Sequence, residues 1–117
     1  MTYVDGVVAA VPTANKEKYI EFAKEMAVVF KEYGALKVVD TWEDDVPNGE
    51  VTSFPLAVQK QEDESVAFSW IVWPSKEARD EGWKSSMDDP RMHPEKNPMP
   101  FDGKRLIYGG FDLVSEL

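Results

Sequence analysis

The sequence predicts one α+β domain, in which a four-stranded antiparallel sheet carries two helices on one of its faces. Two observations lead to this prediction. Runs of β-branched and aromatic residues alternate with stretches whose apolar residues recur every three or four positions, and these are the periods of strands and helices. Proline, glycine and asparagine stand between the stretches, where they favour turns. No long linker divides residues 1–117, so we expect a single domain.

The first strand and the first helix are predicted from the amino-terminal third. Residues 3–11 are rich in β-branched side chains, and Pro12 then removes a hydrogen-bond donor from the sheet, so we expect a strand that ends there. Either Thr13 or Asn15 can cap the helix that follows. Within residues 16–33 the apolar side chains recur at helical spacing and form one stripe.

Gly34 is expected to end this helix in a left-handed conformation. A second strand is predicted at residues 35–43, and the turn residues 47–49 close it. Residues 48–64 form a mixed stretch that can hold a short helical turn. One side of the second strand is expected to carry Leu36, Val38, Asp40 and Trp42.

The third strand and the second helix follow directly on one another. Residues 66–73 form the strongest strand pattern, and both of its faces are largely apolar. Ser75 is a suitable helix cap, and the helix is expected to end before Pro90, since proline disfavours helical geometry in the residue that precedes it. The apolar stripe of this helix consists of Ala78, Gly82, Trp83 and Met87.

A proline-rich connection, residues 90–100, leads to a last strand at residues 104–114. The adjacent Gly109 and Gly110 indicate a bulge or a close backbone approach within this strand. The predicted order is therefore strand, helix, strand, strand, helix, strand. This is the split βαβ, or ferredoxin-like, arrangement, with both helices on one face of the sheet.

A second copy of the chain is the expected partner. Two helices cover only one face of the sheet, yet the first and third strands are apolar on both faces, and an exposed apolar patch usually marks an interface. Two sheets stacked about a two-fold axis would form a dimeric α/β barrel. The alternative is a monomer in which residues 48–64 fold over the open face.

The composition limits the classes of function. A formal net charge of −9 disfavours contact with nucleic acid, because such contact depends on Lys and Arg. No segment approaches the roughly 20 apolar residues of a membrane-spanning helix, so no membrane partner is expected. The absence of cysteine excludes disulfides and thiol chemistry and is compatible with a cytoplasmic location.

Four segments resemble the YbaA-like family of bacterial proteins, domain of unknown function 1428. They are residues 42–49, 68–76, 87–92 and 99–111, and the resemblance runs nearly end to end. It implies the dimeric ferredoxin-like fold and a cytoplasmic location, and it implies no particular reaction. The segment 93–98 matches the family pattern least well.

The second half of the chain concentrates aromatic and arginine side chains, which are typical of a small-molecule pocket. We expect such a pocket between the sheet and the helices, with Arg91 or Arg105 holding an anionic group and Asp102 orienting it. The alternative is structural: tryptophans fill the core and the interface, and Arg91 pairs with Asp102. The candidate pocket residues are Trp42, Trp70, Arg79, Arg91, Phe101, Asp102 and Tyr108.

No metal or cofactor is predicted. His93 is the single histidine, and its proline-rich surroundings favour a solvated surface position over a catalytic one. The acidic pairs 44–45 and 88–89 lack the spacing of a calcium loop, and the glycines fit no phosphate-binding fingerprint.

Two functions stay open from sequence alone. The first is small-molecule binding, extending by fold analogy to a cofactor-independent enzyme of monooxygenase type. The second is a non-catalytic dimeric module with a structural or regulatory role.

Overall fold

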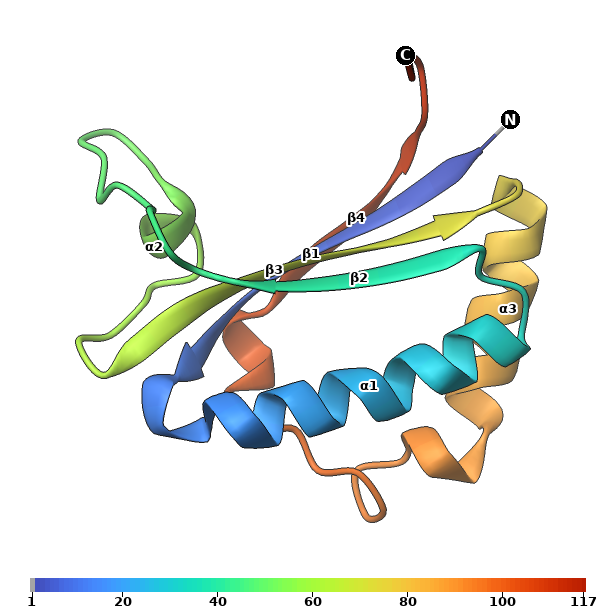
Figure 1. Cartoon of the computed structure of the whole chain (residues 1–117), viewed down its shortest axis with the longest axis horizontal. Helices are drawn as coiled ribbons and strands as arrows, with labels where there is room; N and C mark the ends of the chain where they lie inside the picture. Colours follow the sequence, from blue (N-terminus) through green and yellow to red (C-terminus); the bar gives the residue numbers. More distant parts are fainter. Residues whose placement is uncertain (1) are drawn as a thin grey trace.

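One antiparallel sheet runs through the computed structural model, which describes residues 2–117 (Figure 1). Its strands are β1 (Tyr3–Pro12), β2 (Lys37–Trp42), β3 (Glu64–Trp73) and β4 (Ile107–Asp112). They lie side by side in the order β2-β3-β1-β4, so the two long strands are central. The order of elements and the sheet topology are those of the ferredoxin-like α+β fold, as the sequence predicts.

Two helices lie against one face of the sheet, α1 (Lys16–Glu32) and α3 (Lys76–Asp88) (Figure 1). The short helix α2 (Phe54–Ala57) lies beyond the opposite face, at one end of the strands. We call these the helix face and the open face of the sheet. Among residues 2–117 no helix combines the length and the apolar character needed to span a membrane.

Local signals set most helix boundaries. The Ser75 hydroxyl accepts a hydrogen bond from the Ala78 amide at 3.1 Å and caps α3 as expected. Gly34 follows α1 with a φ of 114°, which L-residues with side chains rarely adopt. The expected side-chain cap of α1 is wrong, however. The Asn15 side-chain amide instead donates to the carbonyl of Pro100 at 3.0 Å, which ties the proline-rich connection to the start of α1.

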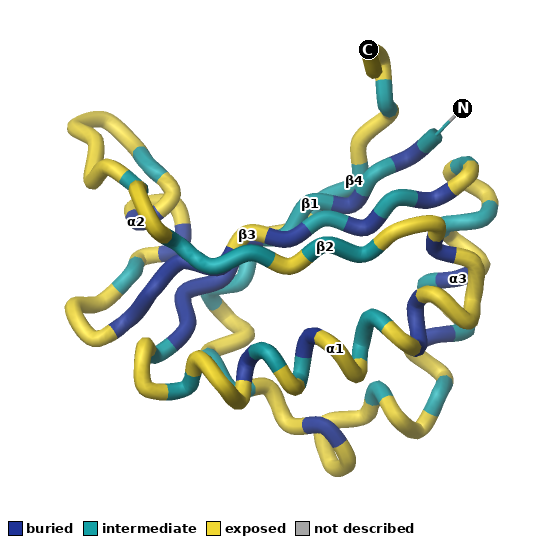
Figure 2. The backbone as a smooth tube through the Cα atoms, in the orientation of Figure 1, coloured by how far each residue is buried: buried dark blue, intermediate teal, exposed yellow. Residues whose placement is uncertain are grey.

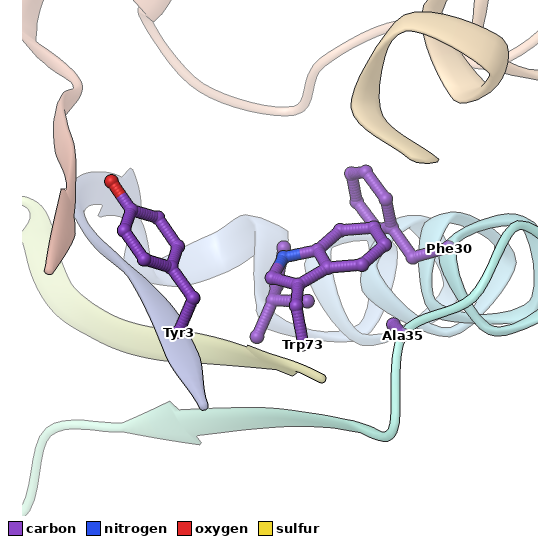
Figure 3. Close-up of a cluster of buried hydrophobic side chains, with 5 residues drawn as sticks. Tyr3, Phe30, Ala35 and Trp73 are labelled. Atoms are coloured by element: carbon purple, nitrogen blue, oxygen red, sulfur yellow. The ribbon is translucent and has the colours of Figure 1, made fainter. Parts of the chain in front are cut away.

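The strand register assigns each side chain to a face. Tyr3 pairs with Trp73 and Ala9 with Ala67, and these residues face the helices. Trp73 is fully buried and packs against Phe30 of α1 in one core cluster, shown in Figure 3. Helix α3 approaches this indole at Gly82, where a Cβ atom would lie 2.3 Å from the Trp73 ring.

The open face is covered at one end only. The segment that carries α2 places Val58, which is fully buried, against Val8, Ala10 and Val66. Residues 48–64 therefore do fold over this face, but the apolar surface beyond them remains exposed. Its large exposed side chains are Phe68, Ile107 and Phe111. Figure 2 shows the contrast between the buried central strands and the more exposed edge strands β2 and β4.

The last strand begins later than predicted. Residues 103–105 form a 3-10 turn, and β4 starts at Ile107. The guanidinium of Arg105 bonds the carboxylates of Glu64 and Asp102, so this segment is fixed by ion pairs instead of by strand pairing. The close approach predicted at Gly110 is confirmed, because a Cβ there would lie 2.3 Å from the Tyr3 hydroxyl oxygen.

Candidate functional site

A pocket of ≈340 Å³ opens between α1 and β2 on the helix face of the sheet. Its volume falls at the lower end of the range for small-molecule sites. Four of its residues come from one side of α1, where a helix presents positions three and four apart, and three come from the end of β2. The lining consists of Tyr19, Ile20, Ala23, Lys24, Asp40, Thr41 and Trp42.

Aromatic rings form one wall of this pocket. The Tyr19 ring lies 5.7 Å from the Trp42 ring, centroid to centroid, and 6.1 Å from the Phe101 ring. Phe101 also meets Phe22 of α1 edge to face at 5.8 Å. These tilted and edge-to-face arrangements are the favoured geometries of aromatic pairs. The cluster fixes the orientation of Tyr19, which is 7% exposed.

Two hydroxyl groups meet where α1 packs against β3. The Tyr19 Oη and Ser69 Oγ atoms are 3.1 Å apart, and either can be the donor. Burial raises the pKa of the Tyr19 phenol, because desolvation disfavours the phenolate, and the nearby Asp40 carboxylate acts in the same direction. The hydrogen bond with Ser69 opposes part of this shift. The phenol therefore stays protonated at neutral pH and can donate.

Charged groups stand at the edge of the pocket. Asp40 lies directly opposite Ser69 in the β2-β3 register, on the same face of the sheet. Lys24 contributes an ammonium group from α1. Lys16, one turn before Tyr19, places its Nζ atom 5.7 Å from the centroid of the Trp42 ring. An aromatic wall with a few convergent polar groups is the arrangement that small-molecule sites use.

A second, smaller pocket of ≈190 Å³ lies between the end of β2 and the segment that carries α2. It is bounded by residues 41–46 and by Phe54, Val66 and Phe68. One of its carboxylates, Glu43, already accepts from the Val66 amide and lies 3.7 Å from Lys60. We therefore regard the pocket between α1 and β2 as the stronger candidate.

Two of the residues predicted for a pocket lie at this site. Trp42 lines the pocket, and Phe101, directly after the proline-rich connection, packs against Tyr19. The other five lie elsewhere in the fold, on both faces of the sheet.

Arg79 belongs to a partly buried ion pair. Its Nη2 atom is 2.9 Å from Oδ1 of Asp5, which is 4% exposed, and its guanidinium carbon lies 5.1 Å from the centroid of the Tyr3 ring. The Trp73 indole donates to the other oxygen of Asp5 at 2.9 Å. This network joins α3 to β1 and to β3, and it leaves Arg79 committed to the fold.

Arg91 is committed to a surface ion pair. Its Nη1 atom lies 2.7 Å from Glu32 at the end of α1, and its Nη2 atom lies 2.9 Å from Asp89. Tyr33 donates to the same Asp89 carboxylate at 2.9 Å. These bonds tie the end of α3 to the end of α1.

Asp102 does not pair with Arg91, so the ion pair offered as the structural alternative is wrong. Asp102 lies 3.0 Å from Arg105, which in turn makes two bonds of 2.6 Å to Glu64 at the start of β3. The pairing fixes the approach to β4.

Trp70 and Tyr108 lie away from the pocket. Trp70 is opposite Gly6 on the open face, 5.5 Å from the Phe68 ring. Tyr108 sits on the edge strand β4 and is 72% exposed. The seven predicted residues therefore do not share one cavity.

Sequence reasoning missed the polar part of the pocket. Tyr19 fits the apolar stripe of α1, which conceals its hydroxyl group, and Ser69 stands inside a strand pattern. The available signal was Asp40, a carboxylate on the otherwise apolar side of β2. Among residues 2–117 no group of three or more His, Cys, Asp or Glu side chains is placed to hold a metal ion.

The fold and the pocket define an α+β ferredoxin-like domain with a cavity of small-molecule size. Residues 2–103 match the family described as "Protein of unknown function (DUF1428)", and the chain belongs to this family. It is 54% identical over 114 residues to the uncharacterized protein YbaA of Escherichia coli K12, covering 97% of each chain. The YbaA protein of Shigella flexneri matches with the same identity and coverage.

A solved structure shares the fold. It is a dimeric ferredoxin-like protein from an uncultured marine organism, with a TM-score of 0.59 and 11% sequence identity. The match covers 99% of this chain and 98% of that one. At this identity the similarity concerns the fold alone.

Proposed function

We propose that this protein binds a small planar organic molecule in the pocket between α1 and β2. The observation that carries the proposal is Tyr19, which lines a pocket of ≈340 Å³ beside an aromatic wall and whose hydroxyl oxygen lies 3.1 Å from that of the buried Ser69. The wall contributes apolar contact area, and the hydroxyl pair with Asp40 contributes orientation. Of the residues predicted from the sequence, Trp42 and Phe101 stay in the proposed site.

Catalysis at the same pocket is a second candidate function. It is favoured by the presence of a protonated phenol and a carboxylate in one cavity, since such a pair can act as acid and base. A cofactor-independent enzyme of monooxygenase type fits this description by analogy of fold.

We further propose that the working unit is a homodimer that pairs through the open face, in the cytoplasm. Phe68, Ile107 and Phe111 are 41%, 42% and 62% exposed there, and clustered apolar side chains of this size favour association. The similar solved structure is that of a dimeric protein, which supports the proposal. A non-catalytic dimeric module is the alternative if the pocket binds nothing.

A thermal-shift screen with paired tryptophan variants tests the binding proposal. Trp42→Leu removes the pocket wall, and Trp70→Leu makes the same change on the opposite face. A metabolite that binds the folded protein raises its melting temperature. Metabolites that bind in the pocket should therefore stabilise the wild type and Trp70→Leu, but not Trp42→Leu, which lacks the pocket wall. Compounds that stabilise all three proteins equally would contradict the proposal, and a library without effect on any of them would favour the non-catalytic module.

A further inference from the structure

The Tyr19–Ser69 pair holds a proton donor that the protein itself does not use. Each hydroxyl carries one proton and two acceptor lone pairs, and the bond between them uses one proton. The hydrogen bonds of residues 2–117 include no second partner for either side chain. Both residues are more than nine-tenths buried, at 7% and 8% exposure. A buried donor without an acceptor is costly, so an oxygen that accepts this proton would be favoured at the site.

An acceptor stands beside this donor. Asp40 lines the same pocket as Tyr19, and it is the direct cross-strand neighbour of Ser69. Cross-strand neighbours have Cβ atoms about 5 Å apart. A single hydroxyl group on a ligand can therefore accept from the hydroxyl pair and donate to the Asp40 carboxylate. A carbonyl or ether oxygen can accept from the hydroxyl pair but cannot donate to Asp40, and a methyl group can do neither.

The rest of the lining limits the body and the charge of the ligand. The Trp42 ring with Ile20 and Ala23 forms an apolar surface suited to a flat ring. Lys24 and Asp40 contribute one charge of each sign, so the seven lining residues have no formal net charge; Lys16 lies outside the lining, over the Trp42 ring. Such a lining disfavours carboxylic acids and phosphates relative to neutral compounds.

We propose that the pocket selects neutral ring compounds that carry a hydroxyl group, the chemical class of phenols and cyclic enols, with Tyr19–Ser69 as donor and Asp40 as acceptor. This inference rests on the proposed function and adds to it the class of ligand. Tyr19 and Ser69 are positioning residues for the hydroxyl group.

Phenol and toluene test the selection, since they differ in size by very little and differ in the hydroxyl group. Titration of ¹⁵N-labelled protein followed by NMR should move the Trp42 indole signal and the Asp40 amide signal with both probes. Phenol should bind about three- to tenfold more tightly, which corresponds to one or two net hydrogen bonds. In Tyr19→Phe and in Asp40→Asn the preference for phenol should shrink towards one, while the affinity for toluene stays the same.

Two further variants keep the test decisive. Tyr19→Phe leaves Ser69 unpaired and can destabilise the fold, so Tyr19→Phe/Ser69→Ala removes both hydroxyl groups and should fold while showing no preference. Tyr33→Phe, which removes a hydroxyl bonded to Asp89 outside the pocket, should keep the full preference.

The outcomes separate the inference from the proposed function. Equal binding of phenol and toluene at the pocket signals would overturn the inference and leave the binding site standing. A preference that survives in the Tyr19→Phe/Ser69→Ala variant would also overturn it. If neither phenol nor toluene moves the Trp42 and Asp40 signals but a metabolite from the screen does, the proposed ligand class is wrong. If no compound moves these signals, the proposed function fails as well.

Discussion

Arg79 donates two hydrogen bonds to the buried carboxylate of Asp5. Its Nη2 atom lies 2.9 Å and its Nε atom 3.1 Å from the same Oδ1 atom. The second oxygen accepts from the Trp73 indole. Both carboxylate oxygens of Asp5 are thus hydrogen-bonded, and the residue is only 4% exposed. A buried charge with such partners is tolerated, whereas the same charge without them is strongly unfavourable.

Arg79→Ala should therefore lower the free energy of unfolding by about 3 kcal/mol, the lower end of the usual loss for a buried pair, because Asp5 is buried but Arg79 is partly exposed. The matched control is Arg91→Ala, which removes an exposed pair and should cost much less, because solvent screens exposed charges. Urea denaturation followed by tryptophan fluorescence measures both. Equal losses in the two variants would show that the Asp5 site is more hydrated than its burial indicates.

Gly110→Ala should destabilise the protein, because the new Cβ would lie 2.3 Å from the Tyr3 hydroxyl oxygen and 2.6 Å from Nη2 of Arg79. We expect a loss of about 1–3 kcal/mol, as for other overpacked sites. Gly109→Ala is the control, since its Cβ would meet Phe111 at an ordinary 3.6 Å. Thermal unfolding of the two variants should differ clearly, and similar melting temperatures would contradict the close approach.

Phe111→Glu should convert the proposed dimer into a monomer. The Phe111 ring lies over Gly6 and Gly109 on the open face and is 62% exposed in the single chain. A carboxylate there cannot be buried against a second copy without a large desolvation cost. Tyr108→Glu places the same charge three residues earlier in β4, on the other face of the sheet, and should leave the dimer intact. Sedimentation velocity distinguishes the two, and a wild-type protein that sediments as a monomer would refute the pairing.

The Glu64–Arg105 pair predicts a specific acid response. Hydrogen bonds from Arg105 lower the pKa of Glu64 below its ordinary value. The Glu64 carboxylate therefore binds a proton less readily in the folded state than in the unfolded state. The stabilisation is present above the unfolded pKa, about 4.3, and is lost as the pH falls through the lower folded pKa. Arg105→Gln should be clearly less stable than the wild type near neutral pH, and the gap should narrow in acid.

Urea titrations at several pH values measure this gap. Part of it comes from Asp102, whose pKa is also lowered, first by the Lys104 amide and then by Arg105. Arg105→Gln/Glu64→Gln removes the paired carboxylate and should be less sensitive to acid than Arg105→Gln alone. A gap that stays constant with pH would mean that Arg105 contributes through packing only.

Local chemistry explains why most of the fold was predictable. The Ser75 cap, the positive φ at Gly34 and the close approach at Gly110 each follow from the properties of one residue in its immediate sequence. The alternating apolar pattern of the strands and the spacing along α1 likewise need only neighbouring residues. These features together fixed the order of elements, and that order admits few topologies.

The site depends on partners that are far apart in the sequence, and this is why it was only partly predictable. Tyr19 and Ser69 are 50 residues apart, and Arg91 bonds Glu32 across 59 residues. Arg91 and Asp102 are both charged and near in sequence, which favoured a direct pair between them, but each found a partner on a different element. Only the strand register reveals that Asp40 and Ser69 are neighbours.

The pocket and the open face lie on opposite sides of the same sheet. If two copies join through their open faces, the two pockets point outward, and two layers of strands separate them. Each would then fill without sensing the other, so a titration should follow a simple hyperbola with a Hill coefficient of about one. Occupancy would report ligand concentration in a graded manner, with no threshold.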